Sequence, residues 1–321
     1  MNYLMLSVGR RGELLKDFRK SMEPGSKIIA TDLSPYAPAL YFADKQYLVP
    51  RIDDSSYIDT VLDICKKEEI DAVTTFIDPE IELLAKNRGR FAELGVEVLA
   101  PYEHTAKLCF NKYLMFSHLV QRGISTVKTW GTIEEFDQAN QGFPVFVKPR
   151  TGSGSVGARK VNSHEELSIA MAEDPSLIIQ EYMDCLDLDA DVYIDTISHA
   201  AVTAFSKRKI ETRIGGASKT VSFKDEKLFA FIQQICRVLK FNGPVDMDFF
   251  YRDGQYYLSE VNPRFGGAYL HAYGAGVDFI KLIENNLNGI ENKPNFGDYE
   301  EGVVMMMYDS VVIRKPGELV K

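Results

Sequence analysis

The stretch Glu260-Val261-Asn262-Pro263-Arg264-Phe265-Gly266-Gly267 decides the fold of this chain. It follows a run with strand character, Gln255-Tyr256-Tyr257-Leu258-Ser259. Side chains alternate faces along an extended chain, so Glu260, Asn262 and Arg264 project together. Carboxylate and amide oxygens are hard ligands that suit Mg²⁺, and arginine binds phosphoryl oxygens through two hydrogen bonds. The stretch therefore predicts Mg²⁺ held against phosphate, and a solvent-exposed strand edge followed by a turn is the alternative.

Two further carboxylates support a metal site. Asp246 and Asp248 alternate within an apolar run, and Asp253-Gly254 predicts a hairpin to the strand that ends at Glu260. Like charges on paired strands repel each other unless a cation lies between them. A metal ion is the simplest explanation for this arrangement.

The composition indicates a globular protein with two or three domains, because 321 residues can bury several sizeable cores. The net charge of −9 argues against non-specific binding to nucleic acid, which depends on Lys and Arg. No apolar run is long enough for a membrane span, and the short N-terminal run predicts a buried strand. The scattered cysteines favour reduced thiols in a cytoplasmic protein; they are Cys65, Cys109, Cys185 and Cys236.

Strand and helix patterns alternate over the first third of the chain, which predicts parallel strands with helices on both faces. Longer strands dominate after about Asp189. Strands are expected at 4–8, 28–31, 72–76, 96–99, 144–148, 158–161, 177–182, 190–196, 200–206, 219–223, 245–251 and 255–261. Helices are expected at 13–20, 55–67, 79–94, 113–122, 165–171, 225–239 and 277–287.

The first of two glycine-rich stretches is Gly9-Arg10-Arg11-Gly12, which follows the first strand, with Asp32 after the second. This pattern imitates a dinucleotide fingerprint, although the full GxGxxG is missing. A nicotinamide-dependent oxidoreductase is therefore an alternative, and a tight turn in a Rossmann-like domain is the favoured interpretation.

The second stretch, Gly152–Gly157, joins two predicted strands, which indicates a flap whose backbone amides can fold over phosphates. Lys148 lies in the apolar strand before it, where its ammonium can reach phosphate as a point charge. The chain has no GK[ST] ending of a Walker loop, and it has neither HRD nor DFG, so P-loop and protein-kinase interpretations fail. A surface loop is the alternative.

These features, in this order, resemble the ATP-grasp superfamily, and in particular its carbamoyl-phosphate-synthetase-large-subunit-like branch with a single ATP-grasp unit. Lys112, Lys148, the flap, Asp248 and the stretch from Glu260 to Arg264 follow the family's order and spacing. The N-terminal third is similar to the family's pre-ATP-grasp domain. The resemblance implies an α/β, Rossmann-like domain at 1–101, followed by an α+β ATP-grasp fold with a small lobe at 102–183 and a large lobe at 184–321.

The resemblance also implies roles for individual residues. Catalytic roles fall to Arg264, Lys148, Arg213 and Lys219, and Lys112 joins Lys148 on the ATP phosphates. The flap residues Ser153, Gly154, Ser155, Val156 and Gly157 close over the phosphates, Glu181, Tyr182 and Met183 bracket adenine, and Asp189 approaches the ribose. Asp248 and Glu260 bridge Mg²⁺, or Mn²⁺ in its place, with Asn262 as a further ligand.

Family chemistry converts a carboxylate into an acyl phosphate, which an amine or related nucleophile then attacks. The loop from Arg213 to Lys219 resembles the synthetase's substrate-facing loop without its histidine. Arg213 and Lys219 are therefore expected to hold an organic carboxylate, and a solvated basic turn is the alternative. The implied function is an ATP- and Mg²⁺-dependent ligase for a small-molecule carboxylate and amine. A subunit of a split synthetase, or a homo-oligomer, also fits the resemblance.

Overall fold

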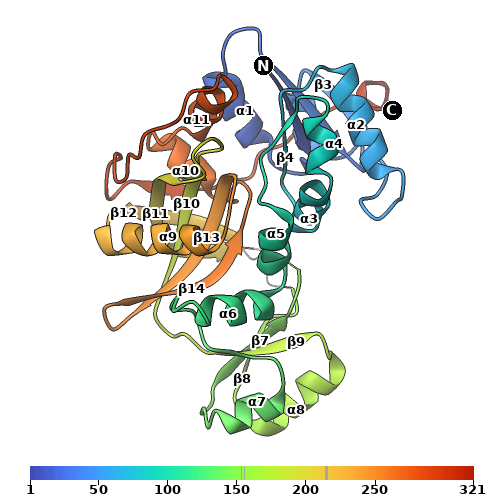
Figure 1. Ribbon diagram of the computed structural model, residues 1–321. Helices are drawn as coiled ribbons and strands as arrows, with labels where there is room; N and C mark the ends of the chain where they lie inside the picture. The colour runs from blue at the N-terminus through green and yellow to red at the C-terminus, as the bar shows by residue number, and fades with distance from the viewer. Residues whose placement is uncertain (153, 155, 214–215) are drawn as a thin grey trace.

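The computed structural model describes residues 1–152, 154, 156–213 and 216–321, and it places them in three sheets (Figure 1). The first sheet is parallel in the order β3-β2-β1-β4-β5. Its strands are β1 (Asn2–Leu6), β2 (Lys27–Asp32), β3 (Lys45–Leu48), β4 (Ala72–Thr75) and β5 (Glu97–Val98). Its helices are α1 (Gly12–Ser21), η1 (Pro38–Phe42), α2 (Tyr57–Lys67), α3 (Asp78–Lys86) and α4 (Arg88–Ala92).

Both faces of this sheet are buried, as the alternating pattern predicts. Tyr3 and Met5 contribute to one core, and Leu4 and Leu6 contribute to another. Two features differ from the sequence-based expectation. The helix predicted at 79–94 is two helices that meet at Asn87, and the short edge strand β3 was not predicted.

The second sheet is antiparallel in the order β6-β9-β7-β8 and forms the small lobe. Its strands are β6 (Thr129–Trp130), β7 (Val145–Pro149), β8 (Arg159–Val161) and β9 (Leu177–Glu181). Helices α7 (Ile133–Gln138) and α8 (His164–Glu173) lie beside it, and α5 (Glu103–Phe110) and α6 (Lys112–Val120) lead into it from the first sheet (Figure 1). The small lobe has a core of its own, centred on Trp130, Phe136 and Val147.

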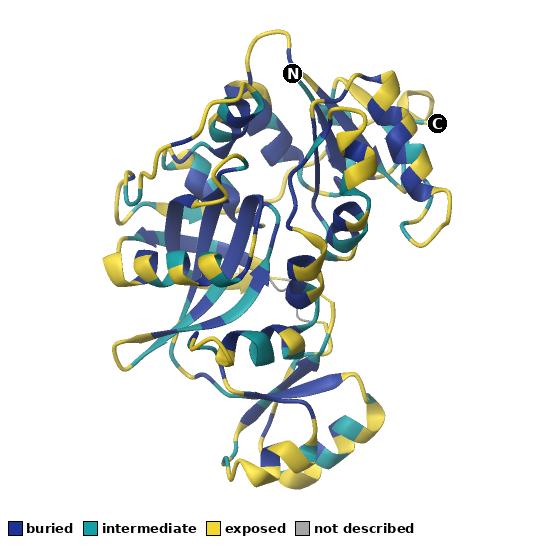
Figure 2. Ribbon diagram, viewed as in Figure 1, coloured by how far each residue is buried: buried dark blue, intermediate teal, exposed yellow. Residues whose placement is uncertain are grey.

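The third sheet is antiparallel in the order β14-β13-β10-β11-β12-β15 and forms the large lobe. Its strands are β10 (Leu186–Ile194), β11 (Ala201–Arg213), β12 (Gly216–Phe223), β13 (Gly243–Arg252), β14 (Gln255–Asn262) and β15 (Val304–Met306). Helices α9 (Glu226–Val238), α10 (Tyr269–Gly274) and α11 (Phe279–Leu287) complete it. Figure 2 shows buried strands in this lobe and an α9 whose outer face is exposed.

The large lobe and the N-terminal sheet share one hydrophobic core. Phe18 of α1 packs edge-on against Phe265, which in turn contacts Tyr269 and Phe279. After β15 the chain returns to the N-terminal sheet, where the Arg314 guanidinium lies 5.3 Å from the centre of the Tyr41 ring. This return ends with η2 (Pro316–Glu318). Within the described parts of the chain, no helix combines the length and apolarity that a bilayer crossing needs.

Candidate nucleotide and metal site

A cavity of about 690 Å³ lies where the three sheets meet. The N-terminal sheet contributes residues that follow β1 and β4, which are the neighbouring strands where the strand order reverses. In open α/β sheets, ligands bind outside the carboxyl ends of the strands at this point. Most predicted site residues line the cavity, namely Lys112, Lys148, Gly154, Val156, Glu181, Tyr182, Met183, Asp189, Asp248, Glu260, Asn262 and Arg264.

Two lysines enter the cavity with different surroundings. The Lys112 ammonium donates to the Gly152 carbonyl at 2.6 Å and lies 3.5 Å from a Glu260 carboxylate oxygen. The Lys148 side chain is equally buried, and among the described residues its ammonium has no hydrogen-bond or ion-pair partner. Burial lowers the pKa of Lys148, which the nearby Glu260 partly offsets. Lys148 is therefore a buried cation able to accept an anionic ligand.

The predicted pairing of the acidic hairpin is confirmed. Asp248 lies opposite Glu260, and Asp246 lies opposite Asn262, in the antiparallel pair of β13 and β14. The Asn262 amide nitrogen lies 3.4 Å from an Asp246 carboxylate oxygen, which leaves the amide oxygen available. Asp248, Glu260 and the Asn262 oxygen form a hard-oxygen donor set on one wall of the cavity. This set fits Mg²⁺.

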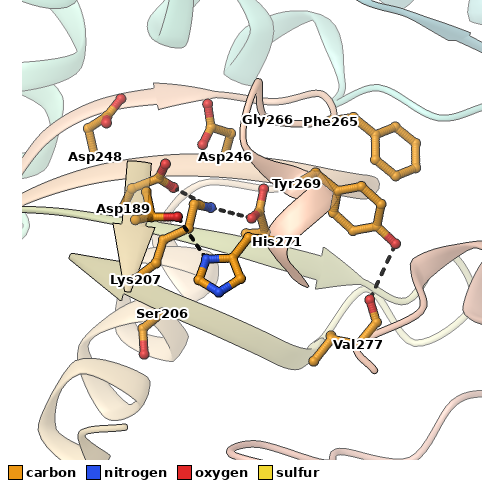
Figure 3. Close-up of polar contacts among 12 residues, drawn as sticks. Asp189, Ser206, Lys207, Asp246, Asp248, Phe265, Gly266, Tyr269, His271 and Val277 are labelled. Carbon is orange, nitrogen blue, oxygen red and sulfur yellow. Dashed lines mark hydrogen bonds and ion pairs between the residues drawn. The ribbon is translucent and has the colours of Figure 1, made fainter. Parts of the chain in front are cut away.

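Lysines already counter part of the acidic charge, which the sequence analysis did not predict. The Lys209 ammonium lies 2.6 Å from Asp248 and 2.8 Å from Asp187. The Lys207 ammonium pairs with Asp191 and lies 3.0 Å from Asp189 (Figure 3). Lysine ammoniums as well as a metal ion can therefore lie between these carboxylates, so like charges on paired strands do not by themselves require a metal ion.

The deepest carboxylates lie beside one another around Lys207. Carboxylate oxygens of Asp189, Asp191 and Asp246 lie within 4.8 Å of one another, and one Asp191 oxygen has no hydrogen-bond partner among the described residues. Burial raises the pKa of Asp189 and of Asp191 to about 6, against the opposing effect of Lys207. Burial opposes a charge on Lys207, yet Asp189 and Asp191 raise its pKa, so the lysine stays protonated. Asp189, expected near the ribose, is therefore also the partner of a buried lysine.

The carboxylates of Asp189, Asp191 and Asp246 are called the acidic floor below. Arg264 and Arg11 connect the segments around this acidic floor to the N-terminal sheet. Arg264 donates to Asp78, at the start of α3, with an N–O distance of 2.8 Å. Arg11 donates to the carbonyls of Gly266 at 2.9 Å and Phe265 at 3.1 Å. Burial and the repulsion of Arg264 lower the pKa of Arg11 to about 10. Because their partners lie more than 180 positions away, no local motif could have revealed these contacts.

Gly266 allows the turn after β14 to approach the acidic floor (Figure 3). A Cβ atom built on Gly266 would lie 2.6 Å from an Asp191 oxygen and 2.8 Å from an Asp246 oxygen. Such contacts are far inside van der Waals distance, so glycine is required here. Next to it, a Cβ atom built on Gly267 would have its nearest neighbour, the Arg11 guanidinium, at 3.8 Å, which is ordinary van der Waals contact.

The predicted adenine side of the cavity has its own ion pair. The Glu181 carboxylate accepts from Arg252 at 2.7 Å, so this side chain is engaged within the protein. The Lys160 ammonium lies 4.2 Å from the centre of the Tyr182 ring, and the Met183 side chain is buried in the cavity wall. Tyr182 and Met183 therefore offer the flat and apolar surfaces that a base would contact.

Arg213 and Lys219 do not line this cavity. Arg213 lies 3.2 Å from Asp309 of the C-terminal segment, and Lys219 lies 2.7 Å from Glu211 across the β11–β12 hairpin. The Arg213 side chain is largely exposed, and the Lys219 side chain is partly exposed. Their expected contact with a carboxylate substrate stays a prediction.

Two family models match the chain, one described as the PylC-like N-terminal domain at residues 3–99 and one as the ATP-grasp domain at residues 109–268. The chain belongs to the ATP-grasp family. It carries one ATP-grasp unit, as the sequence resemblance implied. All predicted site residues lie between Lys112 and Arg264, so the ATP-grasp match includes every one of them.

Known proteins with the ATP-grasp fold are similar over most of this chain. A formate-dependent phosphoribosylglycinamide formyltransferase of Haloquadratum walsbyi is 22% identical over 261 residues, covering 75% of this chain and 62% of the relative. A carbamoyl phosphate synthase large chain of Saccharolobus solfataricus is 24% identical over 302 residues, covering 87% of this chain and 28% of the relative. The chain therefore spans less than two thirds of the length of these relatives.

The solved biotin carboxylase domain of 2-oxoglutarate carboxylase from Hydrogenobacter thermophilus, in complex with MgADP and bicarbonate, has a TM-score of 0.75 and 17% identity. The match covers 94% of this chain and 73% of that domain. It confirms the predicted fold class, a Rossmann-like sheet followed by a two-lobed ATP-grasp fold. The domain boundaries at 101 and 183 stay predictions.

The remaining predicted residues concern the flap and the dinucleotide alternative. Ser153 and Ser155 lie outside the described residues. Gly157 has a φ of +75°, which favours glycine, and a Cβ atom there would lie 3.2 Å from Pro149. The Asp32 carboxylate accepts from the backbone amides of Gly9 at 2.9 Å and Ser34 at 3.0 Å, so it stabilises its own turn in this ATP-grasp chain.

Proposed function

We propose that this chain is an ATP- and Mg²⁺-dependent ligase that joins a carboxylate to an amine or a related nucleophile. The observation that carries the proposal is the buried ammonium of Lys148, which has no hydrogen-bond or ion-pair partner among the described residues and lies in one cavity with the oxygen donors Asp248 and Glu260. A buried cation beside an acidic wall suits a polyanion that brings its own divalent metal.

The proposed roles are those that the family resemblance implies, and they are supported by the shared cavity that most of these residues line. Lys148 and Lys112 bind phosphate oxygens, and Asp248, Glu260 and Asn262 hold Mg²⁺, for which Mn²⁺ could substitute. Gly154, Val156 and Gly157 belong to the flap over the phosphates, together with Ser153 and Ser155. Tyr182 and Met183 contact adenine, with the Glu181 backbone beside them, and Asp189 lies on the ribose side.

Arg264 is proposed to stabilise charge on the phosphoryl group during transfer, and Asp78 holds its guanidinium in place. A carboxylate oxygen attacks the γ-phosphorus, the bond to ADP breaks, and an acyl phosphate forms. The nucleophile's nitrogen then attacks the acyl carbon, phosphate leaves, and the nitrogen loses its proton to solvent. Positioning and neutralising two anions supply most of the catalysis in such phosphoryl transfers.

The nucleotide is tested by thermal unfolding with Mg-ATP or with NADH. A ligand present at a hundredfold excess over its Kd stabilises a protein by about 2.7 kcal/mol. We expect this stabilisation with Mg-ATP and none with NADH. Stabilisation by NADH alone would favour the oxidoreductase alternative and refute the proposal.

The reaction is tested by ADP release across a set of carboxylates and amines, followed by hydroxylamine trapping. The correct acid should yield a hydroxamate only when ATP is present, because hydroxylamine captures an acyl phosphate. Positional isotope exchange in ATP should accompany it. A substrate that is consumed without either signal would contradict the acyl-phosphate step. The native mass, measured by light scattering, will show whether a second copy or a partner subunit belongs to the enzyme.

A further inference from the structure

A second cavity, of about 670 Å³, adjoins the nucleotide cavity. The turn between β1 and α1, the end of the β11–β12 hairpin and the C-terminal segment from Met305 to Val312 form it. The two cavities share four wall residues, which are Arg11, Gly216, Ala217 and Gly267. A molecule in the second cavity therefore lies next to whatever fills the first.

Two arginines of the second cavity converge on one carboxylate. Arg10 of the N-terminal sheet lies 3.7 Å from Asp309, and Arg213 of the large lobe lies 3.2 Å from the same side chain. Their positions adjoin the shared wall, since Arg10 precedes Arg11 and Arg213 pairs with Gly216 in the hairpin. The chain thus places a carboxylate of its own where two guanidiniums from different sheets can bind one.

The contacts with Asp309 are easily replaced. The side chains of Arg10, Arg213 and Asp309 are 78%, 63% and 67% exposed, and exposed ion pairs add little to stability. The C-terminal segment is held independently at both ends, by the pairing of β15 with β12 and by Arg314 against Tyr41. Another carboxylate can therefore take the place of Asp309 while the fold stays intact.

Apolar side chains in the second cavity favour an apolar body on its ligand, and the carboxylates of Glu13, Asp17 and Glu211 line other parts of it. Met305, Met306 and Met307 line one side, and Phe42 and Leu270 line another. Methionine side chains are flexible and polarisable, so they adapt to apolar groups of different shape. Arginine pairs select the planar carboxylate group by charge and geometry.

We propose that the second cavity binds the acid substrate, a carboxylic acid with an apolar chain, whose carboxylate replaces Asp309 between Arg10 and Arg213. The inference rests on the proposed ligase function and adds the class of acid, the role of Arg10 and the competition by Asp309. Lys219, paired with Glu211 and absent from the lining, has no part in it.

The test is calorimetric titration with butanoate, hexanoate and octanoate in the presence of Mg²⁺ and a non-hydrolysable ATP analogue, with hexanamide as the uncharged control. We expect the acids to bind and hexanamide not to bind. Arg10→Gln and Arg213→Gln should weaken acid binding at least tenfold, and Asp309→Asn should strengthen it at least threefold. Arg51→Gln is the matched control, because Arg51 is an exposed arginine paired with Asp53 and lines neither cavity.

Two outcomes overturn the inference while nucleotide binding persists. One is that none of the acids binds the wild-type protein. The other is that the acids bind with the same affinity to the Arg10→Gln and Arg213→Gln variants. If the wild-type protein does not bind the nucleotide analogue, the proposed function itself is refuted. One set of titrations therefore distinguishes failure of the proposed function from failure of this inference.

Discussion

Replacement of Lys148 by methionine should separate binding from stability. The buried Lys148 ammonium has no hydrogen-bond or ion-pair partner among the described residues, so Lys148→Met removes a buried charge that Glu260 offsets only in part, at nearly constant volume. We expect the free energy of unfolding without nucleotide to stay the same or to rise by about 1 kcal/mol. A hydrogen bond to a charged group contributes about 1.5–3 kcal/mol, so Mg-ATP should bind roughly 10-fold to 150-fold more weakly. Urea denaturation and calorimetric titration measure the two quantities.

Lys112→Met is the matched control, because Lys112 is just as buried but has partners. Its loss leaves the Gly152 carbonyl and the Glu260 carboxylate without their cation. We expect this variant to lose about 1–3 kcal/mol of stability in addition to weaker Mg-ATP binding. The reasoning is refuted if Lys148→Met is destabilised as much as Lys112→Met, or if its affinity for Mg-ATP is unchanged.

Four further variants test the surroundings of the acidic side chains and one buried histidine. Gly266→Ala should cost about 1–3 kcal/mol of stability in urea denaturation, because its Cβ meets Asp191, whereas Gly267→Ala should cost little; equal costs would contradict the close approach. Glu260→Ala should abolish ADP release while near-UV circular dichroism stays native, and normal turnover at ordinary Mg²⁺ would exclude the metal role. Burial lowers the pKa of His271 to about 4, so its contribution to stability is lost as pH falls below 6.5, at up to about 1.4 kcal/mol per pH unit. His271→Gln should flatten that slope between pH 6.5 and 4, and an unchanged slope would show that other groups cause it.

Local patterns predicted the parts of the site that lie on one hairpin. Alternation placed Glu260 and Asn262 on one face, and the Asp253-Gly254 turn predicted the hairpin. A β-bulge next to Asp248, which the sequence analysis did not predict, shifts the register by one residue and sets Asp248 opposite Glu260. These relations depend on neighbours within about twenty positions, where strand geometry is decisive. The parallel pairing of strands in the N-terminal sheet also followed from its strand–helix alternation, whereas the order of the strands was not predicted.

The contacts between distant segments could not be predicted in this way. Lys207 and Lys209 lie in an ordinary strand, and only the pairing of β11 with β10 places them against Asp189 and Asp187. Asp78 likewise reaches Arg264 because the sheet and the large lobe pack together. Charge balance across strands is a tertiary property, and the sequence shows the charges without their partners.

The separate core of the small lobe has a consequence for how this protein unfolds. The N-terminal sheet and the large lobe share their hydrophobic contacts, whereas Trp130, Phe136 and Val147 pack with neighbours from the small lobe. The small lobe is joined to the large lobe beside Leu258, whose backbone amide and carbonyl bond to Ser125 and Val127. Heating should therefore melt the chain in two cooperative units, and a calorimetric enthalpy larger than the van't Hoff enthalpy would reveal it. A stabilising substitution in one unit would leave the melting temperature of the other unit unchanged.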